Sequence, residues 1–140
     1  MDLPQLSLSK FENNGMCFGC GELNPHSLKM KSRSDGDTAI CEFIPTEFHQ
    51  GWPGYAHGGA LMAAIDESIG YATFLKKVYC VTAEINVRLK SMASLQEPLT
   101  VFARVVKQTS RTVEVEALVK RQDGSLVAEA SSIQYIVKMP

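Results

Sequence analysis

The sequence lacks an excess of charge of either sign. Its 140 residues include 14 basic and 15 acidic side chains, which gives a formal net charge of -1. A dedicated nucleic-acid-binding domain usually carries a clear basic excess, so we expect no nucleic-acid partner. Charged residues still make up 21% of the chain and hydrophobic residues 45%. These fractions argue against disorder and are typical of one globular domain with a substantial core.

The sequence also lacks long apolar runs. The first five residues, Met1 to Gln5, contain no basic segment followed by an apolar stretch, so no signal peptide is predicted. The best candidate for a membrane span is interrupted by Asp66 and Glu67. We therefore expect a cytoplasmic protein without membrane contact, whose four cysteines are reduced thiols.

A second closely spaced cysteine pair is missing as well. Cys17 and Cys20 have the spacing of half a zinc site, but a structural zinc ion takes four ligands. Cys41, Cys80 and His26 could complete the set, although both of these cysteines lie in strand-like patterns typical of a core. We therefore expect no metal and no cofactor. Cys17 and Cys20 are interpreted as part of a turn packed near a functional loop.

Strand and helix patterns cover most of the chain after residue 26. Residues 1–26 are rich in Asn, Gly and Pro and are expected to form a lead-in segment, with a short helix near Leu6–Glu12. Residues 27–140 are expected to form the domain. Six segments have the composition or alternation of strands, namely 28–34, 38–44, 81–90, 99–107, 112–121 and 126–137. Asp35-Gly36 and Asp123-Gly124 supply hairpin turns.

The only long helical pattern spans residues 58–76. Its apolar residues lie on nearly all sides, so the helix must be covered all round. Two strands precede it, and the four that follow are predicted to form an antiparallel meander. The predicted architecture is α+β, with a curved antiparallel sheet wrapping the helix and a second subunit covering the remaining surface.

Asp66 and Glu67 are the only charged residues between Gly58 and Leu75. A carboxylate on an apolar helix is costly to bury unless it is paired or used. Consecutive helical positions point about 100° apart. Asp66 is therefore predicted to share a stripe with Gly59, Met62, Ile69 and Thr73. Glu67 is placed nearer Ala60, Ala63, Gly70 and Tyr71. Ion pairing with Lys76, Lys77 or a basic residue of the sheet stays open, because structural ion pairs are commoner than catalytic carboxylates.

His57-Gly58-Gly59 directly precedes or begins this helix. Unpaired N–H groups at a helix start favour negative charge, and glycine lets a ligand approach the backbone. The segment could therefore form an oxyanion site, or be a plain turn. Gly59 and Asp66 are separated by roughly 10 Å along the axis, so one carbonyl cannot reach both on the same helix. If both serve one reaction, two helices from two chains must meet.

His57-Gly58-Gly59, with Asp66 nine positions after the histidine, resembles the signature of the hotdog-fold acyl-CoA thioesterases of the PaaI/4HBT type. Two upstream segments, residues 17–25 and residues 49–54 (HQGWPG), are similar to a branch of that superfamily. The resemblance covers nearly the whole chain. It implies a hotdog fold of about five to six strands, a homodimer or a dimer of dimers, and hydrolysis of an acyl-CoA to a free acid and CoA.

The resemblance also implies catalytic roles. The N–H of Gly59, which lies with Gly58 at the start of the helix, polarises the thioester carbonyl. Asp66 acts as general base or as nucleophile, and His57 positions groups around the thioester. Gly70 stands where some members carry a serine or threonine one turn after the carboxylate, and Ser68 or Thr73 are the weak substitutes.

Substrate contacts are expected from two further groups. The resemblance implies that Gln50 helps to hold the reacting groups. His49 lines the acyl or pantetheine channel, or caps a loop. The phosphates of CoA would meet Arg88, Lys90 and Arg111, for which a solvated surface charge is the alternative.

Two other functions compete with hydrolysis. A hotdog hydratase or dehydratase pairs a histidine with an acid, but the position fourteen residues after His49 is Ala63. A non-catalytic acyl-CoA-binding module would keep the glycines and lose the carboxylate. The presence of Asp66 favours catalysis.

Overall fold

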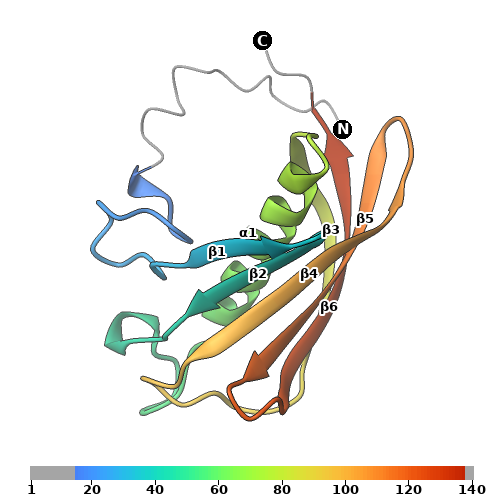
Figure 1. The fold of residues 1–140 in the computed structure, drawn as a ribbon. Helices are drawn as coiled ribbons and strands as arrows, with labels where there is room; N and C mark the ends of the chain where they lie inside the picture. The colour runs from blue at the N-terminus through green and yellow to red at the C-terminus, as the bar shows by residue number, and fades with distance from the viewer. Residues whose placement is uncertain (1–14, 138–140) are drawn as a thin grey trace.

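The computed structural model describes residues 15–137, which form a six-stranded antiparallel sheet curved around one long helix (Figure 1). The predicted helix near Leu6–Glu12 lies outside the described residues. The elements are β1 (Lys31–Asp35), β2 (Thr38–Phe43), the 3-10 helix η2 (Glu47–His49), α1 (Gly58–Leu75), β3 (Cys80–Leu89), β4 (Leu99–Gln108), β5 (Thr112–Arg121) and β6 (Leu126–Ile136). These bounds confirm the predicted α+β architecture.

The order of strands across the sheet is β1-β2-β4-β5-β6-β3. The predicted meander of four strands is therefore wrong at β3, which pairs with β6 along the edge. Residues 90–98 are too long for a tight hairpin and pack against the loop before α1 instead. There Ala56 N–H donates to Ala93 O at 2.8 Å, and Leu95 N–H donates to Gly54 O at 3.0 Å. This connection carries the chain from one edge of the sheet to the middle.

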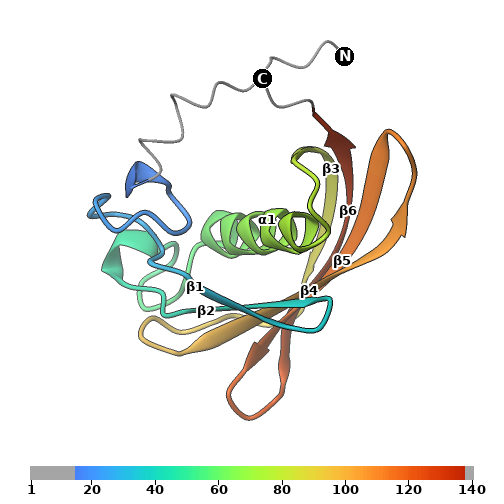
Figure 2. The same ribbon diagram turned by 45° about the horizontal axis from the view of Figure 1, so that its top comes forward.

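The core lies between α1 and the concave side of the sheet, where Figure 2 shows the helix crossing the strands. Small and branched residues make this contact, because alanines on the helix allow the valines of the central strands to approach closely. The fully buried members include Ala64, Ile65, Ile69 and Ala72 of α1 and Val101, Val113, Val115 and Val119 of the sheet. The helix is thereby fixed against the strands over its whole length.

One face of α1 stays exposed in the chain. The exposed stripe, as we call it, consists of Gly59, Met62, Asp66, Gly70 and Phe74. The predicted stripe is wrong in its second half, because Ile69 and Thr73 are buried. A helix has 3.6 residues per turn, so residues three or four positions after Asp66 can both lie near its face. Here the residues at spacings of four stay exposed, and the sheet covers Ile69 and Thr73. Within residues 15–137, no helix has both the length and the apolarity to span a membrane.

Candidate active site

The start of α1 is built by a tightly closed loop. His57 N–H donates to His49 O at 2.7 Å, and Gly51 N–H donates to Tyr55 O at 2.9 Å. His57 is the N-cap residue of the helix, and its Nδ1 accepts a hydrogen bond from Gly59 N–H at 2.8 Å. The amide predicted to polarise a carbonyl is thus occupied by the imidazole. Gly58 N–H has no hydrogen-bond acceptor among the described residues.

Asp66 lies on the exposed stripe midway along α1. Its Oδ1 accepts a hydrogen bond from Thr82 Oγ1 at 2.5 Å, and Thr82 Oγ1 in turn accepts one from Gln134 Nε2 at 3.0 Å. Gln134 is only 1% exposed, and its amide also donates to Ser132 Oγ at 2.6 Å. A fixed polar chain from β6 through β3 therefore orients one oxygen of the carboxylate and leaves the other free.

The ion-pair alternative does not apply to Asp66 within the part of the chain that the structure describes. None of the salt bridges among residues 15–137 includes this carboxylate. Lys76, one of the suggested partners, pairs with Asp37 at 3.0 Å instead. An exposed carboxylate that holds a hydroxyl donor and no cation is free to accept a proton from a second ligand.

Thr82 reaches Asp66 because of a β-bulge. The register between β3 and β6 shifts between Thr82 and Glu84. On the helix side of β3, Cys80, Ile85 and Val87 pack against the core. The predicted shared face from Val81 to Leu89 is therefore wrong at its start, because the bulge turns Thr82 toward the helix. Sequence reasoning missed Thr82, and a threonine among the apolar residues of a strand was its only signal.

The two weak substitutes on the helix do not serve Asp66. Ser68 Oγ donates to Ala64 O and Thr73 Oγ1 donates to Gly70 O, both at 2.8 Å. Both residues are buried on the sheet side of α1. The hydroxyl group next to the carboxylate comes from the sheet instead.

A family model described as "Thioesterase superfamily" matches residues 53–128, which is more than half of the chain. This chain belongs to the thioesterase superfamily. A human relative, acyl-coenzyme A thioesterase THEM5, is 27% identical over 94 residues, or 67% of this chain. Acyl-coenzyme A thioesterase THEM4 from Xenopus laevis is 25% identical over 101 residues. The chain spans only 38% and 46% of the lengths of these two relatives.

Solved structures of similar fold confirm the hotdog architecture of this superfamily member. PaaI of Escherichia coli has a TM-score of 0.78 at 19% identity, covering 94% of this chain and 90% of its own. A hypothetical thioesterase from Streptococcus pneumoniae, solved with coenzyme A, has a TM-score of 0.74 at 19% identity, with 79% and 87% covered. Variants of that streptococcal protein, with alanine at an aspartate and at a threonine sixteen positions later, also match.

His49 and Gln50 stabilise the loop that precedes the helix of this thioesterase-superfamily chain. His49 is 4% exposed; its Nδ1 accepts from Thr46 N–H at 3.0 Å, and its Nε2 lies 2.9 Å from His26 O. Both ring nitrogens are used, which favours the loop-capping alternative. Gln50 Oε1 accepts from Gly54 N–H at 3.0 Å, so its side chain closes the turn after Trp52.

The three predicted phosphate-binding residues are not brought together. Arg88 lines a groove on the outer face of the sheet with Glu116 and Glu129, on the side opposite Asp66. Lys90 Nζ lies 3.4 Å from Glu129 Oε1. Arg111 is exposed in the turn between β4 and β5, where no side-chain partner holds it within residues 15–137. Within residues 15–137, Arg88 and Arg111 have no salt-bridge partner, whereas Lys90 is paired.

Glu67 points away from the exposed stripe toward the segment before β1. Its carboxylate lies 3.7 and 3.8 Å from Cys17 Sγ. Cys20 is the third member of this group, and burial, followed by the nearby Glu67 and Cys17, raises the pKa of its thiol well above the usual range. This shift favours the neutral thiol form of Cys20 over the reactive thiolate.

Proposed function

We propose that this protein hydrolyses acyl-CoA thioesters, with Asp66 of one subunit acting at the helix start of a second subunit. One observation carries the proposal. Gly59 and Asp66 share the exposed stripe of α1, where Asp66 is oriented by Thr82 and pairs with no cation among the described residues. An accessible carboxyl group held in one orientation is suited to general-base chemistry.

The relatives support this choice of substrate. THEM5 and THEM4 are named acyl-coenzyme A thioesterases, and structures with coenzyme A or acetyl-CoA are among the fold neighbours. The aspartate and threonine varied in the streptococcal protein have the same separation in sequence as Asp66 and Thr82. The acyl group is left open by these names.

The surface around the stripe favours a dimer. Met62 is 41% exposed, Phe74 55% and Tyr79 43%, although all three are large apolar or aromatic residues. Phe74 and Tyr79 contact each other, with ring centroids 6.3 Å apart. β3 is one of the two edge strands of the sheet and is ten residues long. Long unprotected edges and exposed apolar groups are typical of surfaces that pair with another chain. An antiparallel second copy would bring its Gly59 toward Asp66.

The proposed reaction needs a small rearrangement at the helix start. Asp66 takes a proton from water, and the hydroxide attacks the thioester carbonyl. The carbonyl oxygen becomes an oxyanion, which accepts hydrogen bonds from the N–H groups of Gly58 and Gly59 of the partner subunit. For this to happen, the hydrogen bond between Gly59 N–H and His57 Nδ1 of the same chain must break. The C–S bond then breaks, and the CoA sulfur takes the proton from Asp66. Arg88 and Arg111 remain candidates for a phosphate contact.

A panel of short, medium, long and aryl CoA thioesters, assayed by release of free thiol, tests the proposal. We expect turnover of at least one member and a loss of about 100-fold or more in Asp66→Asn. Asp35→Asn, at the exposed end of β1, is the matched control and should keep full activity. Hydration of enoyl-CoA without thiol release would instead support a hydratase. Saturable binding without turnover would support a binding module.

A further inference from the structure

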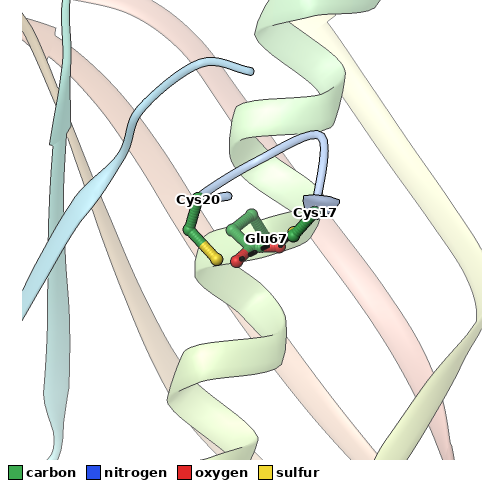
Figure 3. A group of neighbouring side chains, drawn as sticks. All are labelled: Cys17, Cys20 and Glu67. Carbon is green, nitrogen blue, oxygen red and sulfur yellow. Dashed lines mark hydrogen bonds between the residues drawn. The ribbon is translucent and has the colours of Figure 1, made fainter. Parts of the chain in front are cut away.

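Two cysteines and a carboxylate converge outside the proposed active site. The Sγ atoms of Cys17 and Cys20 and a carboxylate oxygen of Glu67 all lie within 4.8 Å of one another. Figure 3 shows the two thiols on the loop that crosses α1, with the Glu67 carboxylate rising from the helix between them. All three residues are half-buried. The group therefore joins two segments that are about fifty residues apart in sequence.

The loop is shaped to present both thiols to Glu67. Gly21 N–H donates to Cys17 O at 2.8 Å, which closes the turn around the pair. A Cβ atom on Gly19 would lie 2.8 Å from the Glu67 side chain, and one on Gly21 would overlap Gly15 O and Cys17. Only glycine allows this approach at either position. Backbone hydrogen bonds from Leu28 to Phe18 O and from Met30 to Gly19 O, 2.9 and 3.0 Å long, then hold the turn on the sheet.

The group offers ligand atoms for a cation and has no cationic side chain paired with it among the described residues. Among residues 15–137, no Lys, Arg or His side chain pairs with Glu67. A half-buried carboxylate without a charged partner is costly, and thiols are weak hydrogen-bond donors that offset little of that cost. A metal ion would satisfy all three groups at once.

The spacing fits zinc. Tetrahedral bonds of about 2.3 Å to sulfur and about 2.0 Å to oxygen place neighbouring ligand atoms about 3.5 to 3.8 Å apart. The Cys17 Sγ distances to Glu67 Oε1 and Oε2 are 3.8 and 3.7 Å, so this pair needs little movement. Cys20 Sγ lies within 4.8 Å of the other two ligand atoms. Mixed thiolate and carboxylate ligands suit Zn²⁺ better than Mg²⁺ or Ca²⁺. We propose that Cys17, Cys20 and Glu67 bind one Zn²⁺ ion, with water at the fourth position.

The ion would have a structural role next to the proposed active site. Glu67 follows Asp66 directly, and Phe18, between the two cysteines, makes an edge contact with the ring of His49 at 6.5 Å between centroids. His49 in turn supports the loop that begins α1. Zn²⁺ would therefore tie the cysteine turn, this loop and the middle of α1 together. Binding releases the two thiol protons to solvent, so affinity should rise with pH.

The test uses the full chain, loaded with Zn²⁺ or Co²⁺ under reducing conditions and freed of excess metal. We expect about one Zn²⁺ per chain by elemental analysis, and a thiolate-to-metal charge-transfer band with the intense visible absorption of tetrahedral Co²⁺. Cys17→Ser/Cys20→Ser should lose both signals. Glu67→Gln should weaken binding by about tenfold or more. Cys80→Ser, a half-buried thiol in β3, is the control that should keep them.

Three results would overturn the site. The first is a wild-type protein without stoichiometric metal after loading. The second is metal retained by the folded double-serine variant. The third is a native protein whose thiol titration finds Cys17 and Cys20 joined as a disulfide. If the double variant fails to fold, the Co²⁺ spectrum of the wild type and of Cys80→Ser still decides whether these thiols bind metal. None of these readouts depends on thioesterase activity.

Discussion

Thr82→Val removes the hydroxyl group that orients Asp66 and keeps the shape of the side chain. The lost hydrogen bond, 2.5 Å between Thr82 Oγ1 and Asp66 Oδ1, joins a neutral donor to a carboxylate. Hydrogen bonds to charged groups contribute about 1.5 to 3 kcal/mol. If this orientation is needed in the transition state, kcat/KM should fall about 10- to 150-fold, because each 1.36 kcal/mol is a factor of ten. The loss should appear in kcat with KM little changed.

Steady-state kinetics on the best CoA thioester measures this change, with thermal unfolding as the check on the fold. Gln134 keeps its bond to Ser132, so the stability loss from its unpaired amide proton should stay within about 1 to 3 kcal/mol. Thr82→Ser, which retains the hydroxyl, should stay within a few-fold of wild type. A folded Thr82→Val protein with unchanged kcat/KM would refute the idea that the polar chain from Gln134 positions the carboxylate.

Three further perturbations test the stability of the fold and the interface. Lys77 follows α1 with φ +60°, a left-handed conformation that is strained for any residue with a Cβ atom. Lys77→Gly should therefore raise the free energy of unfolding by about 0.5 to 1 kcal/mol in urea titrations. A decrease would contradict the assignment of strain to this position. Arg121 donates hydrogen bonds to Glu97 and Ser91 at 2.8 and 2.9 Å, so Arg121→Met should lower the free energy of unfolding by about 2 kcal/mol. Lys31→Met, at the exposed pair with Glu22, should lower it by less than about 0.5 kcal/mol. Phe74→Glu should give a monomer by light scattering with turnover lost; an active monomer would end the dimer proposal.

Local patterns predicted the elements well. The helix bounds were predictable because apolar residues recur along its whole length, and the wrapped sheet followed from the alternation in the strands and the turns Asp35-Gly36 and Asp123-Gly124. The shared face of Asp66 and Gly59 was predictable because positions seven apart lie on one side of a helix. Each of these inferences depends only on the residue pattern within a single helix, strand or turn.

Long-range pairing was not predictable from such patterns. Nothing in β3 itself indicates that β6 rather than β4 is its neighbour, because both strands alternate in the same way. The bulge that turns Thr82 toward Asp66 depends on that pairing. Glu67 joins Cys17 and Cys20 only because the segment before β1 folds over the helix. Nothing in the sequence around Glu67 indicates that its carboxylate lies beside two thiols.

The most direct test of the central claim uses mixed dimers purified with two different affinity tags. If each site combines Gly59 of one chain with Asp66 of the other, a dimer of Gly59→Val and Asp66→Asn chains has one intact site and should show about half of the wild-type activity. A dimer of wild type with the double variant should be inactive. The opposite pattern, with an inactive first dimer and a half-active second, would contradict the account.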